Sequence, residues 1–290
     1  MKINRAAFII FLSAFLIGCV SFAAFIFVVR MQEAQSEEKQ IAEETKIAVS
    51  TPENSSQPKA EATNVQEEQD DRPPNYKIKL LTTGEFHQED VTAKSGGKWL
   101  GLFKENGNYF LQFTKIKVSR VPDPIYSNAD LKNGIKTGKK VDVKGNKEPI
   151  FLLKNAAILP SKKVVTLFSQ NEPDENNSLP NNFARNFNLN GTNYTLKVVS
   201  DNPANEYLDM TSKLILVSGN TEQIVHKMGR CDDCGWSLHW VGDLDGDGKL
   251  DLYADINDHY NVTSRRLFLS SQAEEGKLVK EVAVFHTVGC

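Results

Sequence analysis

Four aspartates lie close together in the segment Trp240–Asp251, which reads W-V-G-D-L-D-G-D-G-K-L-D. They occupy positions 1, 3, 5 and 9 of a loop whose position 6 is Gly248. Carboxylates this close repel one another strongly unless a cation lies between them, and Ca²⁺ prefers oxygen ligands of this kind. The glycine permits a sharp turn, and position 7 contributes a backbone carbonyl. The predicted calcium ligands are Asp243, Asp245, Asp247, Lys249 and Asp251.

The end of the acidic loop differs from that of an EF-hand. An EF-hand completes its calcium shell with a bidentate glutamate at position 12, whereas position 12 here is Ala254. The flanking segments, Ser237–Val241 and Lys249–Ile256, are strand-like, and the second alternates with the period of a β-strand. The loop is therefore predicted to form the tip of a β-hairpin that spans residues 237–256.

The hairpin resembles the calcium-binding hairpins of FG-GAP and VCBS-type repeats, which form the blade loops of integrin α-subunits. That family pattern, D-x-D-x-D-G-x-x-D, is present in full from Asp243 to Asp251. The resemblance implies that positions 1, 3, 5, 7 and 9 bind calcium. It covers only residues 237–270 and occurs once, and a propeller needs several blades. The propeller fold is therefore not implied.

Two cysteines, Cys231 and Cys234, form a C-x-x-C motif just before the hairpin. A thioredoxin-like dithiol would need a helix at this point, but Gly235 and a predicted strand follow. The two aspartates between the cysteines also oppose thiolate formation. Outside the cytoplasm a structural disulfide is the simplest interpretation. Zinc coordination stays open as an alternative because His226 and His239 flank the pair symmetrically.

Acid–base chemistry has weaker candidates. The segment Gly84–Asp90 contains Glu85, His87, Glu89 and Asp90, and the first three would share one face of a strand. Asp258 directly follows the predicted hairpin. Such groups can act as a general acid and base when they converge. The chain contains no serine-hydrolase, zinc-protease or phosphate-binding glycine motif. The sequence therefore gives no clear enzyme signature.

Residues 6–29 form a stretch of 24 residues without a charge. As a helix it would extend about 36 Å, which is enough to cross a bilayer. Lys2 and Arg5 precede it and an acidic segment follows, so the N-terminus is predicted to be cytoplasmic. The expected protein is single-pass in the inner membrane, with its domain on the periplasmic side. In the alternative interpretation, L-I-G-C is a lipobox and Cys19 is lipidated.

Residues 30–75 are rich in Glu, Gln, Ser and Lys and almost lack aromatic residues. Such a segment cannot bury a core, and it is predicted to be a disordered acidic linker. Residues 76–290 show β periodicity with frequent turn residues. The predicted fold is all-β, an antiparallel sandwich or open barrel behind one transmembrane helix. A candidate subdomain boundary lies at residues 171–182.

The net charge limits the kinds of binding partner that the sequence suggests. The net charge is −3 at pH 7, so no basic excess points to nucleic acid. The sequence predicts a membrane-anchored, extracytoplasmic calcium-binding β module that binds an envelope protein or polysaccharide. The alternative is a hydrolase that acts on an envelope polymer with carboxylates such as Glu85 or Asp258.

Overall fold

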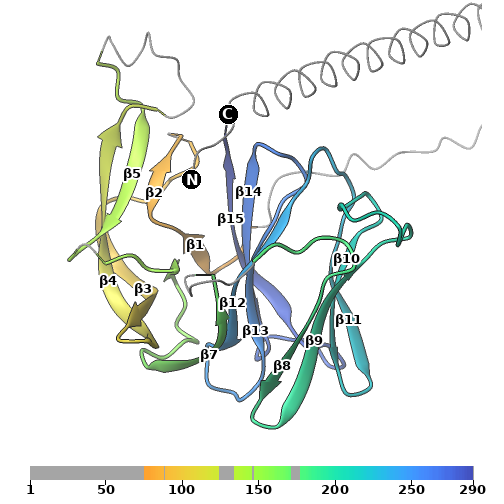
Figure 1. The fold of residues 1–290 in the computed structure, drawn as a ribbon. Coiled ribbons are helices and arrows are strands. Elements are labelled where there is room, and N and C mark those ends of the chain that lie inside the picture. The colour runs from red at the N-terminus through yellow and green to blue at the C-terminus, as the bar shows by residue number, and fades with distance from the viewer. Residues whose placement is uncertain (1–74, 88, 124–133, 146, 171–176, 290) are drawn as a thin grey trace, which may run out of the picture. The chain divides into compact units, whose positions relative to one another are not determined.

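The computed structural model describes residues 75–87, 89–123, 134–145, 147–170 and 177–289. Within these ranges the regular structure consists of antiparallel β-strands, which confirms the all-β prediction (Figure 1). No helix in this described part is long and apolar enough to cross a membrane. The predicted span at 6–29, the predicted linker up to residue 74 and the first part of the predicted boundary, 171–176, lie outside the described residues.

The larger sheet contains 11 of the described strands. Nine of them follow the order β1-β6-β3-β4-β7-β12-β13-β14-β15, while β5 pairs with β4 and β2 pairs with β5. Their bounds are β1 Lys79–Leu81, β2 Gly84–Phe86, β3 Gly96–Glu105, β4 Asn108–Val121, β5 Gly138–Val143, β6 Phe151–Lys154, β7 Lys163–Ser169, β12 Trp236–Asp243, β13 Asp251–Ile256, β14 Val262–Leu269 and β15 Lys280–Val288.

The two end strands of this path, β1 and β15, lie against each other without a ladder between them. The hydroxyl of Tyr76 donates a hydrogen bond of 2.8 Å to Glu281, and the ring of Phe86 meets that of Phe285 edge-on at 5.4 Å. The larger sheet is thus a nearly closed barrel. Of the two predicted architectures, the open barrel describes this sheet.

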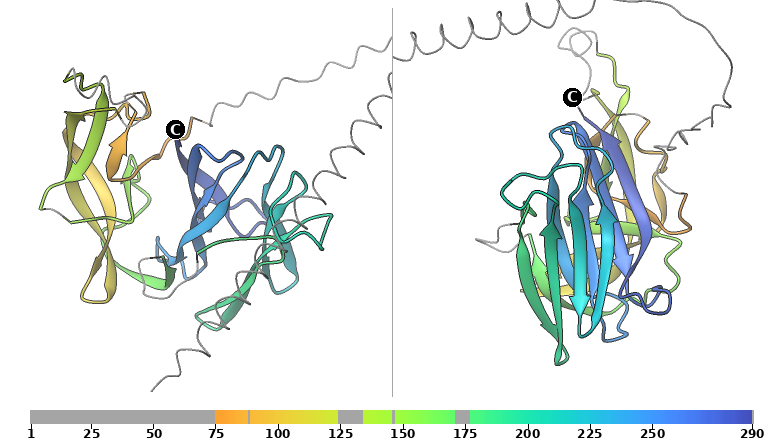
Figure 2. Two further views of the ribbon diagram at one scale, coloured as in Figure 1. Left: turned by 45° about the horizontal axis from the view of Figure 1, so that its top comes forward. Right: turned by 90° about the vertical axis from the view of Figure 1, so that its right-hand side faces the viewer.

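The smaller sheet has four strands in the order β11-β10-β9-β8. It covers the outer face of β12–β14, as the right-hand view of Figure 2 shows. Leu196 and Leu216 from this sheet are fully buried in the same cluster as Leu252 of the larger sheet. The four strands are β8 Ala184–Leu189, β9 Thr192–Val199, β10 Lys213–Ser218 and β11 Thr221–Lys227.

Strand β13 is buried on both of its faces, and all six of its residues are buried. Leu252 and Ala254 pack toward the smaller sheet, whereas Tyr253 points into the barrel and meets the ring of Phe151 at 4.8 Å. Trp240 on β12 is also fully buried, and its indole donates a hydrogen bond of 2.9 Å to Thr166. The acidic loop between β12 and β13 is therefore held at both ends by packed core.

The dipeptide Gly96-Gly97 indicates a turn by its residue types, yet it lies in strand β3. Both glycines do have a positive φ, of 88° and 68°, but they are the first two residues of a strand of ten residues. The strand carries a mainly apolar run, Trp99–Phe103, that is buried in the barrel. Tertiary burial thus decides the structure here, against the local turn signal.

Candidate metal site

The acidic loop joins β12 to β13, as predicted for the tip of a hairpin. Asp243, Asp245 and Asp247 each offer a carboxylate oxygen, and the three oxygens lie within 4.8 Å of one another. Asp243 is buried, Asp245 is half-buried and Asp247 is exposed. The structure thus brings together three of the predicted ligands in a group that could bind a metal ion.

Backbone hydrogen bonds hold Asp243 in the center of the turn. One of its oxygens accepts from the amide of Gly246 at 2.6 Å, and the other accepts from the amide of Gly248 at 3.1 Å. These two glycines have φ values of +85° and +80°, a conformation that costs other L-residues free energy. The glycines of the motif therefore allow the loop to wrap around its first aspartate.

The two carboxylate oxygens of Asp245 lie in different environments. Its Oδ1 accepts a hydrogen bond of 3.2 Å from the amide of Asp247. Its Oδ2 is inaccessible to solvent and has no hydrogen-bond partner among the described residues. A buried carboxylate oxygen without a partner is unfavourable, since it has lost its hydration and gained nothing in exchange. A cation bound between the three carboxylates would supply the missing interaction.

Asp251, the fourth predicted aspartate, is completely buried. Its carboxylate accepts hydrogen bonds from the amide of Leu244 at 2.8 Å and from the amide and hydroxyl of Ser270 at 2.7 and 2.8 Å. Burial, and then the negative charge of Asp245, raise its pKa to about 7. Asp251 is not part of the group of three, and in this structure it ties the loop to the end of β14.

Two lysines lie at the loop. The amide of Lys249 donates a hydrogen bond of 2.8 Å to Asp247, and its side chain is exposed. The ammonium of Lys162 lies directly over Gly246, so that a Cβ added at this glycine would be 1.7 Å from Nζ. The charge of Lys162 offsets part of the repulsion within the acidic group, whose net charge remains negative.

The smaller sheet also supports the loop, which the sequence did not predict. The amide side chain of Asn190, in the turn between β8 and β9, donates a hydrogen bond of 3.4 Å to the carbonyl of Gly248. The buried hydroxyl of Tyr194 accepts a hydrogen bond from the amide of Leu250. Burial raises the pKa of this hydroxyl, and the nearby aspartates add to the rise. The acidic loop therefore joins the two sheets.

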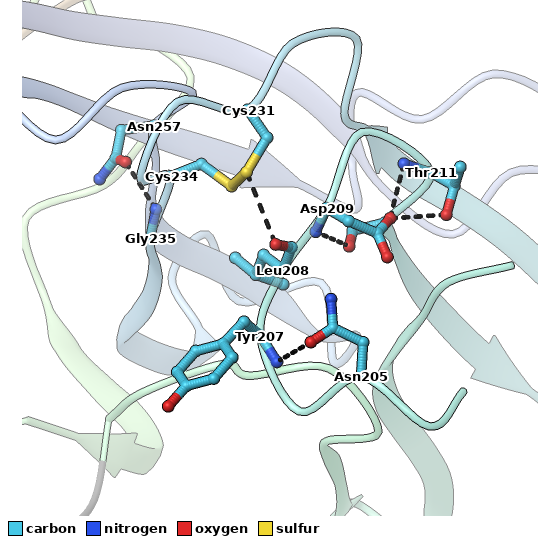
Figure 3. Close-up of a disulfide and its surroundings, with 10 residues drawn as sticks. Asn205, Tyr207, Leu208, Asp209, Thr211, Cys231, Cys234, Gly235 and Asn257 are labelled. Atoms are coloured by element: carbon cyan, nitrogen blue, oxygen red, sulfur yellow. Dashed lines mark hydrogen bonds between the residues drawn. A yellow bond between two sulfur atoms is a disulfide. The ribbon is translucent and has the colours of Figure 1, made fainter. Parts of the chain in front are cut away.

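Cys231 and Cys234 form a disulfide with a Cα–Cα distance of 5.0 Å, as predicted (Figure 3). Bridged sulfurs are neither zinc ligands nor a reduced dithiol, so this structure contains no Cys–His zinc site at the motif. The two flanking histidines lie elsewhere. The ring of His226 packs edge-on against Trp236 at 5.6 Å, and His239 is buried inside the fold.

The disulfide loop is attached to the segment that follows β13. The amide of Asp232 donates to the carbonyl of Asp258, its carbonyl accepts from the amide of Tyr260, and its carboxylate lies 3.0 Å from His259. Cys231 Sγ lies 3.6 Å from the carbonyl oxygen of Leu208, a contact drawn in Figure 3. Because a bridged sulfur carries no proton, this contact contributes packing only. The disulfide thus fixes the end of the β12–β13 hairpin that lies opposite the acidic loop.

The candidate acid–base residues converge only in part. Glu85, His87 and Asp90 line one cavity, whereas Glu89 and Asp258 are not among the residues that line it. Glu85 lies 3.5 Å from the ammonium of Lys140, and the ring of His87 lies 2.8 Å from the buried carboxylate of Asp123. The hydrogen bond to Asp123 is the main cause of a raised pKa at His87. Both groups are therefore engaged in ion pairs.

Comparison of this chain with family models, with curated proteins and with solved structures gives no match.

Proposed function

We propose that this protein is a calcium-binding β module in which the ion stabilises the hairpin of β12 and β13. The observation that carries the proposal is the group of three carboxylates with a buried, unpartnered oxygen on Asp245. The oxygen-only ligand set suits Ca²⁺ better than transition metals, which favour nitrogen and sulfur ligands. The resemblance to FG-GAP and VCBS-type hairpins points to the same ion.

The module is placed outside the cytoplasm in this proposal. The disulfide of Cys231 and Cys234 supports this location, since such bridges persist in oxidising compartments. The uncharged segment at 6–29 serves as a single-span anchor, and residues 30–75 act as a tether. Protease added to spheroplasts should degrade the β domain. Protection of that domain, or lipid attached to Cys19, would contradict a retained anchor.

A binding role suits the site better than hydrolysis. Asp258 does not line the cavity that contains Glu85 and His87, and these two side chains are held by neighbouring groups of opposite charge, Lys140 and Asp123. The acidic loop is also tied into the core by Asp251, which is a feature of a structural ion site rather than of an open catalytic one. The partner is expected to be an envelope protein or polysaccharide.

Direct titration tests the calcium site. Isothermal titration calorimetry of the full-length, chelator-treated protein should show one calcium bound per chain, with a dissociation constant of about 10 µM. Asp245→Asn should abolish this binding because it removes a charged ligand. Lys249→Ala is the matched control and should bind normally, since only its backbone carbonyl is used. Absence of calcium binding by the wild-type protein would refute the proposal.

A further inference from the structure

A cavity of about 440 Å³ opens at the seam of the nearly closed barrel. Its walls are β2 with the adjoining residues 82–83 and 87 on one side, and β14 and β15 on the other. This volume falls in the range of small-molecule sites, which are about 300–1,000 Å³. Neither the acidic loop nor the disulfide contributes to its lining. The cavity is thus a separate feature from the calcium hairpin.

Arg265 on β14 is the only arginine that lines this cavity among the described residues. It pairs in register with Asp255 on β13, but no carboxylate of the described residues lies within ion-pair distance of its guanidinium. Its Nε is buried and lacks a hydrogen-bond partner among the described residues. A half-buried guanidinium that has no carboxylate within ion-pair distance can hold an anionic group of a ligand favourably.

The hydroxyl of Tyr253 lies beside Arg265 and, like Nε of Arg265, has no hydrogen-bond partner among the described residues. It is fully buried and makes no hydrogen bond of normal geometry within the described part of the chain. Burial raises the pKa of the Tyr253 hydroxyl to about 12, although the charge of Arg265 acts in the opposite direction. Arg265 is therefore backed by a neutral phenol, while its charge also attracts the buried carboxylate of Asp255 without forming a close ion pair.

The other walls are polar and include two carboxylates. Glu85 and Asp90 line the cavity together with Thr82, Thr263 and Thr287, whose hydroxyls can donate and accept hydrogen bonds. Asp90 is held in place by a hydrogen bond from the amide of Val288. These carboxylates can accept bonds from hydroxyl or ammonium groups of a ligand, and they would repel a negative charge that lies away from Arg265.

An aromatic ring stands at the rim. The side chain of Tyr260 is 68% exposed, although it lies next to the well-packed disulfide segment. The ring of His259 lies against it at a centroid distance of 4.4 Å and an interplanar angle of 32°. An exposed, positioned tyrosine offers a flat apolar face and a hydroxyl to a bound molecule.

We propose that this cavity binds a small polar molecule through its carboxylate, with Arg265 as the anchor and Glu85 and Asp90 as acceptors for its hydroxyl or amino groups. The inference rests on the proposed binding function and names the ligand chemistry for it. Two sources share this chemistry, namely a uronic acid of a polysaccharide and the free carboxyl end of an amino acid or peptide. A ligand with two negative charges is selected against.

Titration of the calcium-loaded, full-length protein tests the proposal and separates the two sources. The probes are D-glucuronate and alanine, with glucose and alaninamide as matched compounds that lack the carboxylate. One of the two carboxylates should bind with a dissociation constant below about 1 mM, and its matched compound at least about tenfold more weakly. Acetate should compete with the bound probe and acetamide should not. Failure of both carboxylates to bind at about 10 mM would overturn the proposal.

Two substitutions test whether the carboxylate binds in this cavity. Arg265→Gln should weaken binding of the carboxylate at least about tenfold, because it removes the anchor charge. Tyr260→Ala, at the exposed rim, should weaken it about threefold to tenfold without affecting the core. Calcium titration of each variant reports whether the fold is retained. Unchanged carboxylate affinity in both variants would overturn the proposal. If the wild-type protein binds the carboxylate but does not bind calcium, the calcium site alone is refuted.

Discussion

Ser270 bonds to Asp251 through both its amide and its hydroxyl, at 2.7 and 2.8 Å, and thereby joins the end of β14 to the start of β13. The same hydroxyl lies 3.1 Å from an oxygen of Asp247. One small side chain thus orients an aspartate in the core and an aspartate on the surface of the loop. The acidic loop depends on a residue 19 positions beyond Asp251 in sequence.

Ser270→Ala should therefore weaken calcium binding although Ser270 is not a predicted ligand. The substitution leaves Asp251 with one hydrogen bond fewer in a buried setting, at a cost of about 1–3 kcal/mol. For a domain of this size the calcium-free melting temperature should fall by about 2–12 °C. Ser271→Ala is the control, since Ser271 is exposed and lies outside the loop. Equal melting temperatures and affinities for the two variants would contradict this role.

Calcium should raise the melting temperature of the wild-type protein. With a dissociation constant of about 10 µM, calcium at about 1 mM adds roughly 2.7 kcal/mol to the free energy of unfolding. The corresponding shift is about 5–10 °C. Magnesium should give a much smaller shift because it demands a tight octahedral shell and retains its waters. Thermal melts in calcium, magnesium and chelator measure this, and a melting point indifferent to calcium would argue against the site.

The core of the metal site could be predicted from the sequence because its parts are local. Asp243, Asp245 and Asp247 lie within five residues, and the turn that gathers them is encoded by Gly246 and Gly248. The C-x-x-C disulfide is local in the same sense. In such cases, spacing alone brings the groups together.

The supports of the site could not be predicted, since they depend on which strands become neighbours. Asn190 and Tyr194 come from the smaller sheet, and Ser270 follows a strand that pairs with β13. Arg265 gives no signal in the sequence either. It becomes notable only because the barrel buries its Nε without a partner. Contacts between strands distant in sequence are set by tertiary packing, which periodicity does not encode.

Gly242→Ala should destabilise the protein strongly. Gly242 lies on β12 where the pairing with β7 shifts register, and an added Cβ would be 2.0 Å from the carbonyl oxygen of Val165 and 2.6 Å from the ring of Trp240. Neither neighbour can move without disturbing the core, so a cost of at least about 3 kcal/mol is expected. Gly235→Ala is the matched control, because its new Cβ would meet only ordinary contacts at 3.9 Å or more. Chemical denaturation should separate the two variants clearly.

Removal of the disulfide should lower the free energy of unfolding by a moderate amount. A bridge between residues three apart closes a short loop, which corresponds to about 2 kcal/mol of stabilisation in the chain-entropy model. The double variant Cys231→Ala/Cys234→Ala should lose this amount in urea denaturation while it binds calcium with nearly unchanged affinity. Alkylation of the native protein without reductant should leave both cysteines unlabelled. Labelling of both would show that the bridge does not form in the cell.

His239 should make the protein sensitive to acid. Burial, and then the charge of Arg265, lower the pKa of this histidine to about 3. Because the unfolded chain takes up the proton near pH 6.5, stability is fully present above that pH and is lost as the pH falls toward the folded pKa. At pH 5 the loss from this residue is about 2 kcal/mol. His239→Gln should flatten the decline in unfolding free energy between pH 6.5 and pH 5.

His87 provides a control, because its contribution to stability changes with pH in the opposite direction to that of His239. Its pKa is raised, mainly by the hydrogen bond to Asp123, so its contribution is fully present below about pH 6.5 and is lost as the pH rises through the folded pKa. His87→Gln should therefore alter the pH profile only above about pH 6.5. Urea denaturation of both variants across pH 4.5–8.5, a range of about four units, resolves the two windows. An acid decline in His239→Gln as steep as in the wild type would show that this buried ring is not its source.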